Sequence, residues 1–173
     1  MTSATESTPR IRNLADDDWD AVVALEARTY GAVALSEDRV ALESRGRASP
    51  STCFVIESAR QMAGYVLALP YPFRRFPDLT RPESESFGGP NLHFHDFVVA
   101  REYRGRGLAK RLLGRIASTA AAQGFERLSL VAVNGSGPFW TGRGFRTLRE
   151  ITVPPCYGPD AAYLTKTLAV EES

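Results

Sequence analysis

Apolar and polar positions along the chain recur with two different periods, which predict where strands and helices lie. Runs rich in β-branched and aromatic residues predict strands at 10–14, 53–58, 63–69, 92–99, 128–133, 145–152 and 162–168. Helical spacing of Trp19, Val22, Val23 and Glu26 predicts a helix after residues 16–18, and further helices are expected at 36–44, 107–123 and 138–143. This order predicts a mixed α/β fold, with a mainly antiparallel central sheet flanked by helices. The crossover between 92–99 and 128–133 predicts one parallel pair.

Length, composition and charge indicate how many domains the chain has and which partners to expect. The chain has 173 residues, of which 43% are apolar, and this favours one domain at 10–170 after a polar, disordered lead-in at 1–9. A net charge of +1 gives no reason to expect nucleic acid or a membrane as partner. No apolar run predicts a membrane span or a secretion signal, so a cytoplasmic location is expected and a homodimer is left open. Cys53 and Cys156 show no metal-ligand spacing and need not form a disulfide.

The turn at 104–109 carries the most specific chemistry. Its sequence, Arg104-Gly105-Arg106-Gly107-Leu108-Ala109, follows a predicted strand and opens a predicted helix. Free N–H groups and the dipole of a helix start favour a phosphate, and the glycines let it approach the backbone. A dinucleotide motif would need glycine at position 110, where Lys110 stands. The turn therefore predicts a phosphate site of another kind, and the basic residues of 101–115 suit a polyanionic ligand.

The wider pattern around this turn resembles a known family. Arg104-x-x-Gly107-x-Ala109 matches [QR]-x-x-G-x-[GA], with Phe97-Val98-Val99 upstream and Asn134, Phe139-Trp140 and Gly144-Phe145 downstream. This ordered set resembles the GNAT superfamily of acyl-CoA-dependent N-acetyltransferases. The resemblance implies the GNAT fold, acetyl-CoA as acyl donor, and its pyrophosphate in the turn at 104–109.

The same resemblance implies roles for the flanking residues. Phe97, Val98 and Val99 would offer free backbone groups to the pantetheine amides. Asn134 would approach the pantetheine arm, with Phe139 and Trp140 beside it, although Asn134 could equally be a turn residue before Gly135.

His93 and His95 are candidates for removing the proton of an attacking amine. They lie two residues apart on one predicted strand, so alternation puts both on one face with Asp96 opposite. A pKa near 6.5 suits proton removal at neutral pH. The His-x-His pattern resembles arylalkylamine N-acetyltransferases, in which the pair is thought to pass the proton out through water. Hydrogen-bonded structural histidines are the alternative, and a metal is not expected because there is no third histidine.

Trp140 departs from the family pattern. Most members carry a tyrosine there, whose hydroxyl is proposed to protonate the leaving thiolate, and an indole N–H is no practical acid. Either the thiolate leaves unaided or another hydroxyl serves. Tyr157, in a glycine-flanked loop, is the candidate acid, and a turn tyrosine packed on the last strand is the alternative.

The segment 70–90 holds five prolines and four aromatic residues, so it is expected to be a long, ordered loop. One hypothesis places it over the acceptor cleft, with Tyr71, Phe73 and Phe76 as apolar walls. A surface loop pinned by its aromatic residues is the alternative.

Together these features predict an enzyme that transfers an acetyl group from acetyl-CoA to a primary amine of a small molecule, by direct attack in a ternary complex. Two alternatives stay open. One is a protein lysine or N-terminus acetyltransferase, and the other is a non-catalytic module that binds coenzyme A.

Overall fold

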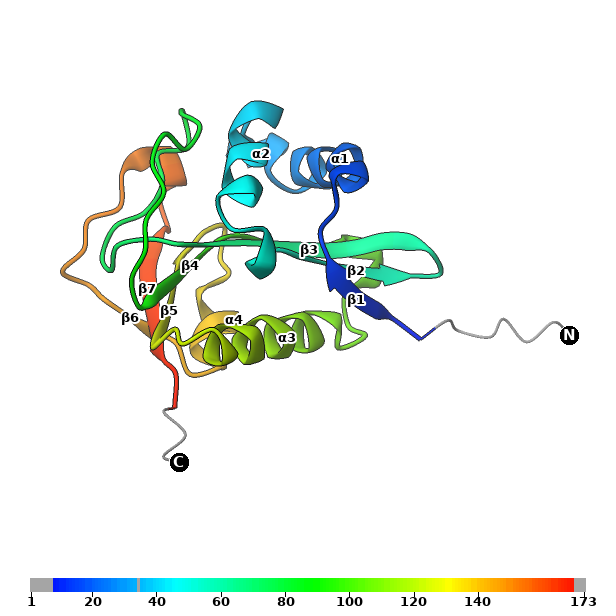
Figure 1. The fold of residues 1–173 in the computed structure, drawn as a ribbon. Coiled ribbons are helices and arrows are strands. Elements are labelled where there is room, and N and C mark those ends of the chain that lie inside the picture. Colours follow the sequence, from blue (N-terminus) through cyan, green and yellow to red (C-terminus); the bar gives the residue numbers. More distant parts are fainter. Residues whose placement is uncertain (1–7, 34, 170–173) are drawn as a thin grey trace, which may run out of the picture.

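The computed structural model describes residues 8–33 and 35–169, and its centre is one seven-stranded sheet with helices on both faces (Figure 1). The expected lead-in at 1–9 therefore lies mostly outside the described residues. The strands are β1 (Arg10–Asn13), β2 (Phe54–Ser58), β3 (Gln61–Pro70), β4 (Asn91–Val99), β5 (Arg127–Ala132), β6 (Arg146–Thr147) and β7 (Ala162–Thr167). The helices are α1 (Trp19–Tyr30), α2 (Arg39–Ala48), α3 (Leu108–Ala122) and α4 (Gly137–Thr141).

The strand order, β1-β2-β3-β4-β5-β7-β6, confirms the predicted fold class. Every neighbouring pair is antiparallel except β4 and β5, which run parallel. The helix α3 makes the crossover between these two strands, as the strand-helix-strand pattern predicts.

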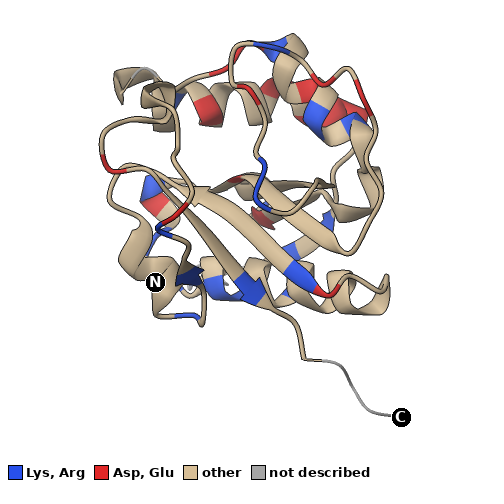
Figure 2. Cartoon of the chain, turned by 90° about the vertical axis from the view of Figure 1, so that its left-hand side faces the viewer, with Lys and Arg blue, Asp and Glu red and all other residues tan. Residues whose placement is uncertain are grey.

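The sheet separates two hydrophobic cores. On one face, α3 buries the apolar side chains Leu108, Leu112, Leu113, Ile116 and Ala120 against the strands. On the other face, α1 and α2 bury Trp19, Val22, Leu25 and Leu42 against β2 and β3. The faces also differ in charge, because every charged residue of α3 is basic whereas α1 and α2 carry acidic residues as well (Figure 2).

Several elements differ from their predicted bounds. The helix expected at 36–44 lies further along the chain, as α2 (Arg39–Ala48), because Asp38 caps its start by accepting from the Ala41 N–H. The hairpin between β2 and β3 turns on Ala59 and Arg60 alone, both in the left-handed region (φ 50° and 64°), so β3 begins earlier than expected. The predicted strand at 145–152 is wrong beyond Thr147. After Leu148 bonds to Tyr163, the chain turns with Ile151 N–H donating to the Leu148 carbonyl, and this ends the strand.

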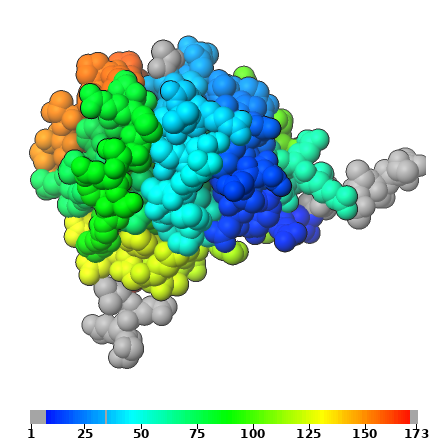
Figure 3. All heavy atoms as spheres, turned by 45° about the horizontal axis from the view of Figure 1, so that its top comes forward, coloured from blue at the N-terminus to red at the C-terminus, as the bar shows by residue number. Residues whose placement is uncertain are grey.

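The segment 70–90 crosses the surface beside α2 as an ordered loop (Figure 3, green beside cyan). Arg45 of α2 fastens it from inside, since its guanidinium donates to the carbonyls of Asp78 and Arg81, each at 2.7 Å. Within residues 8–33 and 35–169, no helix is long and apolar enough to cross a membrane.

Candidate active site

The site begins where the parallel strands β4 and β5 separate. Their pairing runs from Asn91 with Arg127 to Phe94 with Leu130 and then stops, although β4 continues to Val99. On its other side, β4 contains a bulge, because Ala68 pairs with Phe94 and the next residue, Leu67, pairs with Asp96. The splay frees the later part of β4 for a ligand, and the bulge re-aims its side chains.

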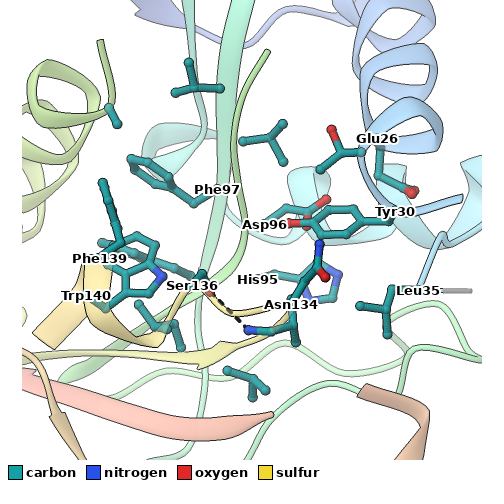
Figure 4. Close-up of a pocket in the computed structure, with 18 of the residues that line it drawn as sticks. Glu26, Tyr30, Leu35, His95, Asp96, Phe97, Asn134, Ser136, Phe139 and Trp140 are labelled. Carbon is teal, nitrogen blue, oxygen red and sulfur yellow. Dashed lines mark hydrogen bonds between the residues drawn. The ribbon is translucent and has the colours of Figure 1, made fainter. Parts of the chain in front are cut away.

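A cavity of about 610 Å³ occupies the splay. It extends from the phosphate turn, past β4 and the start of α4, to α1 and the segment after it (Figure 4). All of the predicted cofactor residues except Arg106 line it, namely Phe97, Val98, Val99, Arg104, Gly105, Gly107, Leu108, Ala109, Asn134, Phe139 and Trp140. Arg106 does not line the cavity, and its guanidinium lies over the ring of Tyr103, at 5.5 Å, so its contact with the pyrophosphate stays a prediction.

The phosphate turn has the geometry that its glycines predict. Gly105 and Gly107 adopt left-handed φ values of 79° and 76°, and a β-carbon built on either would meet nothing within 4 Å. The first helical hydrogen bond of α3 runs from Arg111 N–H to the Gly107 carbonyl, so the N–H groups before it lie in the free first turn. The turn therefore presents open backbone donors to the cavity.

The opposite end of the cavity holds a histidine and three carboxyl groups. His95 Nε2 lies 2.5 Å from Oε2 of Glu37, and Asp96 Oδ2 accepts a hydrogen bond from the Tyr65 hydroxyl at 2.9 Å. The third carboxyl is that of Glu26, on α1.

Burial and charge tune these groups in different directions. Burial alone lowers the pKa of His95, but Glu37 and Asp96 outweigh it and raise the net value above that of an ordinary histidine. Burial raises the pKa of Asp96 to about 7, against the lowering effects of His95 and of the Tyr65 hydroxyl. Thus Glu37 favours the protonated form of His95, while Asp96 can gain and lose a proton near neutral pH.

Behind Glu37 lies a buried ion network. Arg45, with a side chain 1% exposed, donates to Glu37 Oε1 at 2.9 Å and also pairs with Glu83 of the surface loop. Glu37 therefore bonds to two cations, Arg45 and His95. Because Arg45 also pairs with Glu83, this buried network connects the surface loop to the site.

The structure separates the two predicted histidines. His93 does not line the cavity: it is 2% exposed, its Nδ1 lies 2.8 Å from Ser129 Oγ, and its ring stacks on Tyr163. Burial lowers its pKa to about 3, so it stays neutral. The expectation that Asp96 lies opposite His95 is also wrong, because both line the cavity and the bulge interrupts the alternation between them.

Trp140 and Tyr157 both line the cavity. The Trp140 ring lies among Phe97, Phe139 and Phe145, with centroid distances of 5.1, 4.9 and 5.2 Å, and forms an apolar wall. The Tyr157 hydroxyl donates to the Pro77 carbonyl, and burial raises the pKa of this hydroxyl well above that of an ordinary tyrosine.

The aromatic residues of the loop are not cavity walls, so that hypothesis is wrong for Tyr71, Phe73 and Phe76. Their rings pack on other aromatic rings instead: Tyr71 on Phe87 and His93, Phe73 on Tyr163, and Phe76 on Tyr157. The loop reaches the cavity through Leu79.

Sequence reasoning missed Glu26, Tyr30 and Glu37 as lining residues. Glu26 had a signal, since it falls on the apolar face of the first helix, where a carboxyl group is out of place. Glu37 had none, because its partner His95 lies 58 residues further along the chain.

Comparisons with known proteins agree with this geometry. A family model described as the acetyltransferase (GNAT) family matches residues 19–145, whereas none of the curated proteins matches the chain. Among solved structures, N-acetylglutamate synthase from Neisseria gonorrhoeae, complexed with coenzyme A and N-acetyl-glutamate, is 20% identical with a TM-score of 0.72. The match covers 96% of this chain but only 37% of the synthase.

Two further structures match over nearly their whole length. Ard1 from Thermoplasma volcanium is 17% identical with a TM-score of 0.73, covering 94% of this chain and 99% of that one. The GNAT-like decarboxylase GphF, complexed with isobutyryl-CoA, is 22% identical with a TM-score of 0.78, covering 92% of this chain and 100% of that one. These identities establish a shared fold and no more. Since the family model spans most of the chain, the protein belongs to the acetyltransferase (GNAT) family.

Proposed function

We propose that the protein transfers an acetyl group from acetyl-CoA to a primary amine of a small molecule, by direct attack in a ternary complex. The observation that carries the proposal is one continuous cavity with a phosphate turn at one end and an ionisable cluster at the other. A thioester and an amine can meet in such a cavity only between these two ends.

The residues of the donor end fit coenzyme A. The open turn at Gly105 and Gly107 and the start of α3 suit the pyrophosphate, and Arg104 lines the same end. The part of β4 beyond Phe94 has lost its β5 partner, which leaves backbone groups for the pantetheine amides. When bound, acetyl-CoA supplies an acyl carbonyl activated as a thioester.

At the acceptor end, Asp96 is the proposed base. A primary ammonium has a pKa near 10, so roughly three units oppose the neutral form at pH 7. A carboxylate with a pKa of about 7 is matched to taking that proton at neutral pH. His95 is less suited to this step, because Glu37 favours its protonated form.

The leaving thiolate needs no side-chain acid in this proposal. The hydrogen of the Tyr157 hydroxyl is engaged by the Pro77 carbonyl, and a raised pKa makes that hydroxyl a weaker acid. A thiol pKa near 8.5 is close to ambient pH, so the thiolate can leave and take its proton from water.

The acceptor end also bears on the alternatives. A decarboxylase must hold a carboxylate close to the thioester, and three carboxyl groups at this end disfavour such an anion. Leu35 and Leu79 line the cavity from the segment after α1 and from the surface loop, and an acceptor end walled by these two segments favours a small acceptor over a protein chain. A module that only binds coenzyme A would not need a tuned carboxylate beside the splay.

The test is thiol release from acetyl-CoA with a panel of small amines, measured between about pH 6 and pH 9. For wild type, kcat/KM should rise with pH, inflect near pH 7 as Asp96 loses its proton, and then level off while the amine is still an ammonium. Asp96→Asn should lower kcat/KM by about 10²-fold and remove the inflection, with the coenzyme Kd unchanged. An Asp96→Asn variant with the wild-type rate and profile would exclude Asp96 as the base.

A further inference from the structure

Glu26 is a buried carboxyl group with one oxygen unused. It is 1% exposed, on the inner face of α1, and it lines the acceptor end of the cavity. Its Oε2 accepts the Glu37 N–H at 3.1 Å, and a hydrogen bond from the nearby Ser36 side chain lowers the pKa of the carboxyl group. Oε1 still has no partner with full hydrogen-bond geometry among the described residues. A buried carboxylate oxygen without a donor costs free energy, so its position at a cavity needs an explanation.

The charges around Glu26 leave two carboxyl groups without a cation. Four carboxyl groups lie in or directly behind the acceptor end, those of Glu26, Glu37, Asp96 and Glu83. Two cations face them, since His95 pairs with Glu37 and Arg45 pairs with both Glu37 and Glu83. Three more basic residues line the cavity away from this end: Arg104 on the phosphate turn, Lys110 in the first turn of α3, and Arg143, whose guanidinium lies over the Phe139 ring at 3.7 Å. Asp96 and Glu26 are therefore the two carboxyl groups in excess.

Asp96 and Glu26 lie on different elements that enclose the same space. Asp96 is on β4 beside the strand splay, and Glu26 is on α1, with Tyr30 one helical turn after it (Figure 4). Burial raises the pKa of both carboxyl groups, and the charge of His95 lowers both values without cancelling that effect. A ligand that brings two positive charges would neutralise both.

We propose that the acceptor is a dicationic small molecule, a straight-chain diamine, whose reacting nitrogen lies at Asp96 and whose second ammonium binds Glu26. The inference rests on the function proposed above and names its acceptor class. The second ammonium supplies N–H donors to Oε1 of Glu26 and remains charged throughout.

The reaction stays balanced with this acceptor. The reacting ammonium gives one proton to Asp96, its nitrogen forms the bond to the acyl carbon, and the carbon–sulfur bond breaks. The nitrogen loses its second proton as the amide forms, and the thiolate gains one. The second ammonium takes no part, so Glu26 acts in binding and not in proton transfer.

The experiment compares diamines with monoamines of the same length. The probes run from diaminopropane to diaminohexane, each paired with the monoamine in which a methyl group replaces one ammonium. Wild type should show a kcat/KM at least about 10-fold higher for the best diamine than for its paired monoamine. Glu26→Gln keeps the shape and an acceptor for the Glu37 N–H but removes the charge, and should reduce that ratio by about 10-fold or more.

Two controls keep the outcome interpretable. Glu26→Asp retains the charge and should keep part of the preference, while Glu150→Gln removes an exposed carboxylate, 54% exposed and paired with Arg74, and should leave the ratio unchanged. Thermal unfolding and coenzyme titration check that each variant is folded. Equal rates with diamines and monoamines, or an unchanged ratio in Glu26→Gln, would overturn the diamine inference alone. Coenzyme binding without thiol release for any amine would overturn the proposed function as well.

Discussion

Replacing Asp96 with asparagine should make the protein more stable, by an amount that grows with pH. Burial raises the pKa of Asp96 from 3.8 to about 7, so the folded state holds this proton more tightly than the unfolded chain does. The shift is about three units, and at about 1.4 kcal/mol per unit it corresponds to about 4 kcal/mol. Asparagine keeps an oxygen that can accept the Tyr65 hydroxyl and carries no charge to bury.

The sign of the effect follows from where each state loses its proton. Below about pH 4 the carboxyl is protonated in both states, and it costs nothing there. As the pH rises from about 4 to 7, only the unfolded chain releases the proton, so wild type loses stability progressively. The loss is complete above about pH 7, where the asparagine variant should exceed wild type by up to about 4 kcal/mol.

Urea unfolding, followed by tryptophan fluorescence at several pH values between about 4 and 8, measures this difference directly. Asp160→Asn, at an exposed position, serves as control and should show no comparable pH-dependent gain. A stability difference that does not grow with pH would refute the conclusion that the fold holds Asp96 in a protonated, desolvated state. Asp96→Asn should also lose catalytic rate, so its stability and its activity are expected to change in opposite directions.

Three further predictions concern the coenzyme turn, the buried network and the leaving group. Gly107→Ala and Gly124→Ala each place alanine at a left-handed φ, 76° and 85° respectively, in open space, so each should cost about 1–2 kcal/mol of stability. Only Gly107→Ala should weaken coenzyme A binding in calorimetry, because only Gly107 lies in the phosphate turn. Equal affinities of the two variants for coenzyme A would contradict the assignment of this turn. Arg45→Met removes the cation that pairs with the buried carboxylates of Glu37 and Glu83, and should lower the free energy of unfolding by about 3–5 kcal/mol in urea titrations. A decrease below about 1 kcal/mol would show that this ion network does not stabilise the fold. Tyr157→Phe removes the hydrogen bond to the Pro77 carbonyl, so it should lower stability by about 1 kcal/mol but change kcat by less than about threefold. A fall of kcat by about 10-fold, with the coenzyme Kd unchanged, would identify Tyr157 as the acid.

The sequence predicts the parts of this site that depend on local patterns. The strand-turn-helix order fixes the phosphate turn, since the glycines at 105 and 107 and the start of α3 are neighbours in the chain. The same is true of Phe97, Val98 and Val99, which the splay brings to the cavity as expected.

The features of the site that the sequence does not predict depend on contacts between distant segments, or on the extra residue that forms the bulge in β4. The bulge in β4 places Asp96 in the cavity beside His95, and strict alternation gives no sign of it. The partnership of His95 with Glu37, and of Glu37 with Arg45, joins β4 to α2 and to the segment before it, so it appears only in three dimensions. The aromatic residues of the loop were recognised as ordered, but their packing partners on β4, β7 and the loop before β7 decided where they point.

In the proposed reaction, an acetyl group passes from coenzyme A to an amine in one step within this cavity. The most direct measurement is mass spectrometry of the products after incubation with acetyl-CoA carrying an isotopic label in the acetyl group, together with a diamine. We expect the label in an N-acetylated amine, with one free coenzyme A released per amide formed, and a large loss of both in Asp96→Asn. Label found only in free acetate, or label bound covalently to the protein before amine is added, would contradict it.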